Sequence, residues 1–332
     1  MMTNLTPSLA RHGRSRTPAS AVRQQGLTLV ELMIGLLLAL LVTLAATAAL
    51  MASRQGFSAV DSTSQLRDNA RFATTLVQRI VAQAGYQDHS TPGVRPNGSK
   101  LGGAAPVPFV QGQDDTSVTM PAIGPNYQSG NGVNGSDVLV VRFQGASLAT
   151  LDPANPDAGD GSIIDCAGNP LGKTTGQLPE SILYIATGTD GEPSLMCGFV
   201  NPTTGQWSAQ PLVRGVETLQ VRYGVDSPNV PPGVKTTDLP QTYLPASALQ
   251  TPANPPQELL NWQRVKAVRI GMVLRGPVGS ALVRGPQAAS TAYPLGETMH
   301  DANDKGSELP YAGDGRLRQT VTFTVYLRNP QS

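Results

Sequence analysis

The sequence predicts an α+β protein: one long N-terminal helix, formed by a transmembrane segment and a stem, packs on an antiparallel β-sheet head with long loops. Three observations lead to this prediction: an uncharged apolar segment near the N-terminus, an amphipathic pattern directly after it, and later strand-like runs separated by turn-rich stretches. The 332 residues include 35 glycines and 28 prolines, and 14% are charged. This composition favours a loop-rich β domain over a helical bundle.

The apolar segment runs from Leu32 to Met51, and only Thr43 and Thr47 interrupt its apolar and small side chains. As a helix with a rise of ~1.5 Å per residue it would be about 30 Å long, enough to span a bilayer core. Residues 1–26 contain no acid and four arginines, namely Arg11, Arg14, Arg16 and Arg23. By the positive-inside rule we expect a cytoplasmic N-terminus, with the rest of the chain on the far side of the membrane.

Glu31 stands close to the start of this apolar segment, where a charge is costly in a bilayer and calls for a functional explanation. One explanation is local, because Thr28 and Glu31 have the spacing of a capping box at a helix start. The segment could also be a conventional signal peptide cleaved among the small residues 44–49, or a plain signal anchor. The length of the segment and the presence of Glu31 argue against a cleaved signal peptide. In a plain signal anchor, Glu31 would be costly and would serve no purpose.

Beyond the membrane the helix is expected to continue as a stem. Its apolar side chains recur at three- and four-residue spacing, at Leu66, Ala70, Ala73, Val77, Ile80 and Ala84. Such a stripe needs a cover, most simply the following β-sheet. Gly85 is the expected C-cap, so the helix would extend from Leu27 to about Tyr86, roughly 90 Å.

The head, residues 87–332, contains six strand-like runs. They are residues 137–143, 181–186, 194–200, 216–223, 265–274 and 317–327. We expect them to form one antiparallel sheet with the stem on one face. The longest turn-rich loops between them are residues 87–136, 226–261 and 279–316, where partner contacts are common.

Cys166 and Cys197, the two cysteines, both follow the apolar segment, so export would place them in an oxidising compartment. We expect a structural disulfide, because no metal-ligand spacing accompanies them; a redox or metal role is the alternative. Closing a loop of about 30 residues would contribute roughly 3–4 kcal/mol.

The sequence offers no catalytic constellation. It lacks a nucleophile elbow, a phosphate loop and an HExxH motif, and His12, His89 and His300 are scattered. We therefore expect neither an enzyme nor a cofactor. The acids Asp152, Asp157 and Asp160 could offer oxygens to Ca²⁺, but they do not match EF-hand spacing and we predict no metal site.

Nucleic-acid binding is not expected either. Without residues 1–26 the chain has 20 basic and 23 acidic residues, a net charge of −3. A nucleic-acid footprint would need a clustered basic surface.

The stretch Gly26-Leu-Thr-Leu-Val-Glu-Leu32 resembles the N-methylation motif of type IV pilins and type II secretion pseudopilins. The resemblance implies that a prepilin peptidase cleaves between Gly26 and Leu27 and that Leu27 is methylated, although the family usually has phenylalanine there. It divides the chain into a leader (1–26), a transmembrane assembly half of the helix (27–51), an amphipathic stem half (52–86) and the head (87–332).

The same resemblance gives Glu31 a role in subunit assembly. Cleavage would create a positive α-amino group on Leu27, and Glu31 of one subunit would neutralise that of a neighbour as helices pack. A carboxylate in an apolar bundle is tolerable when it is paired in this way. Capping and pairing are compatible roles.

Four further stretches resemble the PilW-type minor pilins. They are residues 67–72, 212–226, 268–275 and 316–329. The resemblance implies a subunit that assembles with other minor pilins and the major pilin on an inner-membrane assembly platform, primes pilus growth and lies near the fibre tip, sometimes with a large adhesin. Twitching motility and adhesion would depend on it. The alternatives are a J-type pseudopilin of type II secretion and a tip adhesin subunit.

Overall fold

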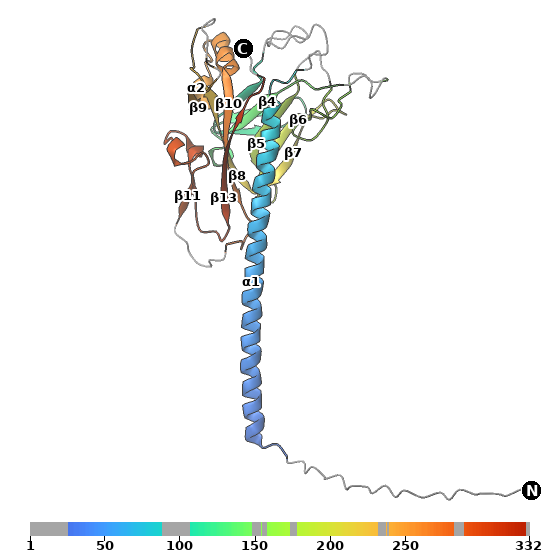
Figure 1. Ribbon diagram of the computed structural model, residues 1–332, viewed down its shortest axis with the longest axis vertical. Helices are drawn as coiled ribbons and strands as arrows, with labels where there is room; N and C mark the ends of the chain where they lie inside the picture. The colour runs from blue at the N-terminus through green and yellow to red at the C-terminus, as the bar shows by residue number, and fades with distance from the viewer. Residues whose placement is uncertain are drawn as a thin grey trace, which may run out of the picture. The chain divides into compact units, whose positions relative to one another are not determined.

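The structure is a computed structural model that describes residues 26–87, 107–147, 154, 158–172, 178–231, 237, 239–281 and 289–329 (Figure 1). The chain divides into two compact units, Met1–Arg54 and Gln55–Ser332. Helix α1, Leu29–Ala82, contributes residues to both units.

The first part of α1, Leu29–Arg54, is long and apolar enough to cross a membrane, judged by length and composition. All of its side chains are exposed in the single chain. The hydroxyl groups of Thr43 and Thr47 donate to helix carbonyl oxygens, at 2.9–3.0 Å. Because these bonds satisfy the hydroxyl donors within the helix, both threonines are compatible with an apolar environment.

The second part of α1 buries the predicted stripe. Its buried side chains are Ala59, Leu66, Ala70, Ala73, Val77, Ile80 and Val81. The helix is shorter than predicted at both ends and continues unbroken through Gly56. Gly85, the predicted cap, lies three residues beyond the helix end with φ +68°, and its N–H donates to the Arg142 carbonyl of the head at 2.9 Å instead of to a helix carbonyl. It therefore ends the turn that follows the helix and does not cap the helix itself.

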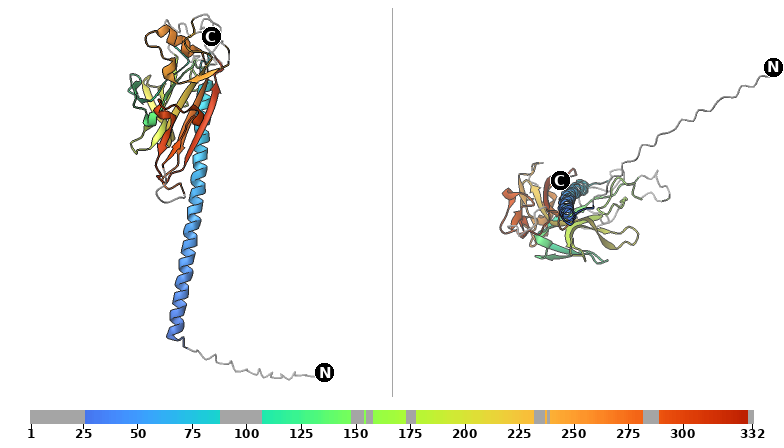
Figure 2. Two further views of the ribbon diagram at one scale, coloured as in Figure 1. Left: turned by 90° about the vertical axis from the view of Figure 1, so that its left-hand side faces the viewer. Right: turned by 90° about the horizontal axis from the view of Figure 1, so that it is seen from below.

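Two larger antiparallel sheets make up most of the head (Figures 1 and 2). The five-stranded sheet has the order β1-β4-β5-β6-β7, with bounds Val110–Gln113, Val138–Arg142, Glu180–Thr187, Pro193–Val200 and Trp207–Arg214. The four-stranded sheet has the order β13-β10-β8-β9, with bounds Arg318–Tyr326, Val265–Arg275, Val216–Val225 and Thr242–Leu244. The buried stripe of α1 and side chains of both sheets form one hydrophobic core.

The six predicted runs are confirmed as strands β4, β5, β6, β8, β10 and β13. The expectation of one sheet is wrong, because the chain passes from the first sheet to the second between β7 and β8. Gly215 makes this turn with φ +79°, a conformation that glycine adopts without strain. Strand β7 was missed because Pro211 and its polar neighbours hide the alternating pattern of an edge strand.

The three predicted loops contain short elements. Two small ribbons form within them, β2 with β3 (Thr116–Thr119, Asn126–Ser129) and β11 with β12 (Ser290–Ala292, Leu309–Tyr311). The short helices are η1 (Val133–Gly135), α2 (Ala246–Leu249), α3 (Pro255–Gln263), η2 (Glu297–Met299) and η3 (Lys305–Ser307).

Residues 290–311 cover the face of the four-stranded sheet that is turned away from the core. The Thr322 hydroxyl donates to the Pro294 carbonyl at 2.6 Å, and Arg222 of β8 forms an ion pair with Asp304. A Cβ atom on Gly271 of β10 would lie 2.2 Å from the Pro294 oxygen. Glycine at 271 therefore permits this close approach.

We predict that Gly271→Ala lowers the free energy of unfolding of the full-length chain in detergent by about 1–3 kcal/mol, because the added methyl group overpacks this contact. Urea unfolding followed by tryptophan fluorescence measures the change. Gly56→Ala is the matched control, since nothing lies within 4 Å of a Cβ at that position. Equal stability of the two variants would contradict the packing described.

Candidate processing and assembly site

The junction between Gly26 and Leu27 lies just before α1 begins. Residues 26–28 are outside the helix, and Leu27 is 77% exposed. A Cβ on Gly26 would meet no atom within 4 Å. An exposed, non-helical peptide next to a helix start is accessible to a peptidase.

Glu31 and Thr28 form the capping box that their spacing predicts. The Thr28 N–H and hydroxyl donate to Glu31 Oε2 at 3.1 and 3.0 Å, and the Glu31 N–H donates to Thr28 Oγ1 at 3.3 Å. These bonds satisfy donors that a helix start leaves free. In the part of the chain that the structure describes, Oε1 of Glu31 accepts no hydrogen bond and is open to a further donor.

The structure joins Cys166 to Cys197 through a disulfide, with the two Cα atoms 5.7 Å apart. Both residues are buried, and the Cys166 N–H donates to the Ser181 hydroxyl at 3.0 Å. The disulfide therefore fastens residues 158–172 to strand β6, and the hydrogen bond fastens them to β5.

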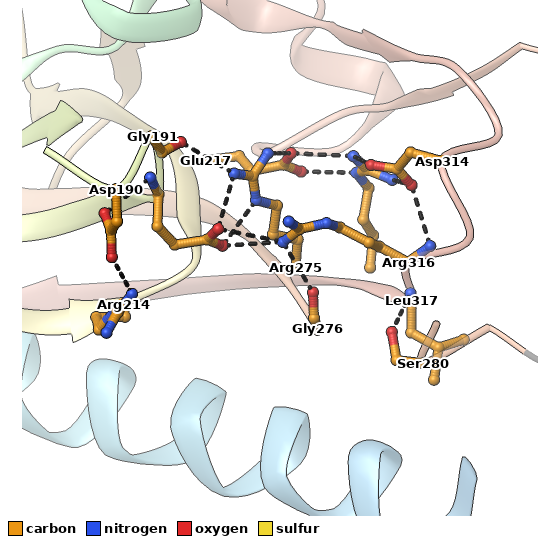
Figure 3. Close-up of polar contacts among 12 residues, drawn as sticks. Asp190, Gly191, Arg214, Glu217, Arg275, Gly276, Ser280, Asp314, Arg316 and Leu317 are labelled. Carbon is orange, nitrogen blue, oxygen red and sulfur yellow. Dashed lines mark hydrogen bonds and ion pairs between the residues drawn. The ribbon is translucent and has the colours of Figure 1, made fainter. Parts of the chain in front are cut away.

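A second polar site, which sequence reasoning missed, lies where the two sheets meet. We call it the arginine–carboxylate cluster; its members are Glu192, Glu217, Arg275, Asp314, Arg316 and Arg318 (Figure 3). Glu192 directly precedes β6 of the five-stranded sheet, whereas Glu217, Arg275 and Arg318 belong to β8, β10 and β13 of the other. The cluster thus links the two sheets with three positive and three negative groups.

The contacts of the cluster are close and shared. Arg275 contacts Glu192 at 2.9 Å and Glu217 at 3.2 Å, and Arg316 reaches Glu192 at 3.0 Å. Arg318 binds Glu217 in a bidentate manner, at 2.6 and 3.0 Å, and also lies over the Tyr311 ring at 4.2 Å. The Glu217 side chain is 6% exposed and the Arg318 side chain 8%, so neither charge is well hydrated and each depends on its partners.

The pKa values reflect this pairing. Hydrogen bonds from Arg275 lower the pKa of Glu192, and those from Arg318 lower the pKa of Asp314. Burial alone would lower the pKa of Arg318, but hydrogen bonds to Asp314 and Glu217 raise it above its ordinary value. Because the two carboxyl groups have lower pKa values folded than unfolded, their stabilising effect is complete above about pH 4–5 and is lost as the pH falls below that range.

The sequence contained one signal for the cluster. Arg318 is the first residue of β13 and Arg316 stands two residues before it, a spacing that places both side chains on one face of an extended chain. Glu217 lies 101 residues from Arg318 and Glu192 lies 124 residues from Arg316, so these pairs could not be assigned without the fold. Asp314, which also pairs with Arg318, stands only four residues before it.

Of the three acids considered for Ca²⁺, the structure describes Asp160 alone. Asp160 accepts hydrogen bonds from the N–H and hydroxyl of Ser162, and Asp152 and Asp157 lie outside the described residues. Among the described residues, no group of three or more His, Cys, Asp or Glu side chains has metal-binding geometry.

We predict that Glu217→Gln lowers the free energy of unfolding by about 3 kcal/mol, because it leaves two arginines with a buried, uncharged partner. Asp190→Asn is the control, since the Asp190–Arg214 ion pair is exposed and we expect no measurable effect. Denaturant unfolding of both variants at neutral pH compares them. A Glu217→Gln variant as stable as the parent would contradict the account of the cluster.

The family model of type IV pilus-assembly protein W matches residues 182–329. A type IV-like pilin from Thermus thermophilus is 16% identical with a TM-score of 0.36, over 80% of this chain and 98% of that chain. A search of curated proteins finds no significant match. The family match includes β8, β10, β13 and all six members of the arginine–carboxylate cluster. The resemblance to the pilus-assembly protein W family is therefore confirmed for residues 182–329.

Proposed function

We propose that this chain is a PilW-type minor pilin, which is inserted in the inner membrane as a prepilin and then assembles into a type IV pilus. The observation that carries the proposal is the match of residues 182–329 to the pilus-assembly protein W family. The N-terminal motif from Gly26 to Glu31, followed by a helix able to cross a membrane, supports it independently.

The proposed processing follows from the N-terminal site. A prepilin peptidase cleaves the exposed peptide between Gly26 and Leu27, and the new N-terminus of Leu27 is methylated. The arginine-rich leader stays in the cytoplasm, and the head lies in the periplasm before assembly. The apolar part of α1 remains in the chain and becomes the part that packs against neighbouring subunits.

Glu31 then has two roles in succession. In the single chain its Oε2 caps the helix through Thr28. In the assembly, its Oε1 accepts from the positive α-amino group of Leu27 in a neighbouring subunit. This pairing sets the axial register, because a carboxylate in an apolar bundle is stable only beside an opposite charge.

Within the pilus system, we place the chain in a minor-pilin complex that primes fibre growth and lies near the tip, thereby supporting twitching motility and adhesion. Its partners would be other minor pilins, the major pilin and the inner-membrane assembly platform. The N-terminal motif is shared with pseudopilins, so a J-type pseudopilin is the second candidate. Deleting the chain distinguishes the two: loss of twitching with normal exoprotein release identifies the pilus, and the reverse identifies type II secretion.

We predict that Glu31→Ala leaves folding and leader cleavage intact but lowers incorporation into sheared pili at least about tenfold, because the partner ammonium group loses its counter-charge. Thr28→Ala is the matched control, since it removes half of the capping box but keeps the carboxylate. Immunoblots of cell and pilus fractions measure both variants. Normal incorporation of Glu31→Ala would refute the pairing mechanism.

A further inference from the structure

Strand β13 forms an edge of the four-stranded sheet and pairs on one side with β10 alone. The pairing runs without a bulge from Ala267 opposite Tyr326 to Arg275 opposite Arg318. With nine residues, β13 is long for an edge strand. An edge of this length is a template for another strand unless something blocks it.

The phase of the β10–β13 ladder shows which backbone groups are free. The Leu327 N–H donates to the Lys266 carbonyl at 2.9 Å, and the Gly276 N–H donates to the Leu317 carbonyl at 2.8 Å. In an antiparallel pair, residues whose backbone N–H and C=O groups bond to the partner strand alternate with residues whose backbone groups point away from it. The backbone N–H and C=O groups of the odd-numbered residues of β13 therefore bond to β10. The N–H and C=O groups of the even-numbered ones, Arg318, Thr320, Thr322, Thr324 and Tyr326, point to the open side.

These groups stay unpaired within the described part of the chain, where no backbone hydrogen bond reaches them. Thr320 and Thr322 are exposed, and Tyr326 is 59% exposed. On the core side, Val321 and Phe323 pack against the hydrophobic core but are only half-buried. A strand added beside β13 would satisfy the free groups and complete the burial of both side chains.

The other edges of the two sheets are protected. Strand β7 contains Pro211, its pairing with β6 has a register shift, and the Trp207 N–H already donates to the Ala122 carbonyl at 3.1 Å. Strand β9 has three residues and β1 has four. By contrast, residues 319–326 contain no proline and no charge. Prolines, charged side chains and bulges, which normally prevent an edge strand from pairing with another chain, are therefore absent from this part of β13.

We propose that the free edge of β13 binds an extended segment of another polypeptide chain, which adds to the four-stranded sheet as an antiparallel strand with apolar side chains at alternate positions. Alternating N–H and C=O groups at strand spacing match an extended polypeptide and no other class of ligand. Pairing of two β13 strands about Thr322 is disfavoured, because it places Arg328 of each copy opposite Arg316 of the other. This binding requires neither leader cleavage nor membrane assembly.

The test uses the full-length chain in detergent and a fluorescein-labelled peptide with the sequence of residues 265–275, the natural neighbour of β13. We expect saturable binding by fluorescence anisotropy, and at least about tenfold weaker binding by Thr320→Pro, which removes a free-edge N–H without touching the β10 ladder. Thr320→Ala, which keeps that N–H, should bind like the parent. Equal binding by the proline and alanine variants, or no binding by the parent, would overturn the proposal.

Hydrogen exchange on the parent chain provides a second readout that does not depend on how the proline variant folds. Added peptide should slow exchange of the amides of Thr320, Thr322 and Thr324, while those of Val321 and Phe323, already paired with β10, change little. Unchanged exchange at the even-numbered amides would overturn the proposal. So would concentration-dependent self-association of the parent that Thr320→Pro abolishes, because a second copy would then be the occupant.

Discussion

The head depends on the burial of one face of a helix. The stripe from Leu66 to Val81 supplies side chains to the core that both larger sheets share, so neither sheet has a complete core without it. Small residues at Ala70 and Ala73 let the sheets approach the helix closely, and both are almost fully buried. Beyond this shared core, the arginine–carboxylate cluster joins the two sheets through ion pairs.

The polar groups of the head are of two kinds, buried ion pairs between strands and backbone groups at a sheet edge. Where the two sheets meet, Glu217 and Arg318 are buried and fully paired, so their charges hold strands from distant parts of the sequence in place. On the open side of β13, no backbone hydrogen bond within the described residues reaches the even-numbered positions. The first arrangement favours stability within the chain, and the second favours contact with another chain.

The local pattern predicted much of this fold. The stem stripe, the capping box and six strands all follow from residue spacing over short distances. The division into two sheets could not be predicted, because it depends on one turn at Gly215 that looks like any other glycine turn. The pairing of Glu217 with Arg275 and Arg318 was likewise hidden, since these pairs span 58 and 101 residues and leave no periodic signal. The free edge of β13 became visible only once the strand order was known.

The central claim is that this chain is processed as a prepilin and retains its apolar helix. The most direct measurement is the N-terminal residue and intact mass of the protein recovered from membranes. The account predicts a chain that begins with methylated Leu27. A start near Ala49, or an intact Met1, would contradict it and would leave the head as a secreted or merely anchored β domain.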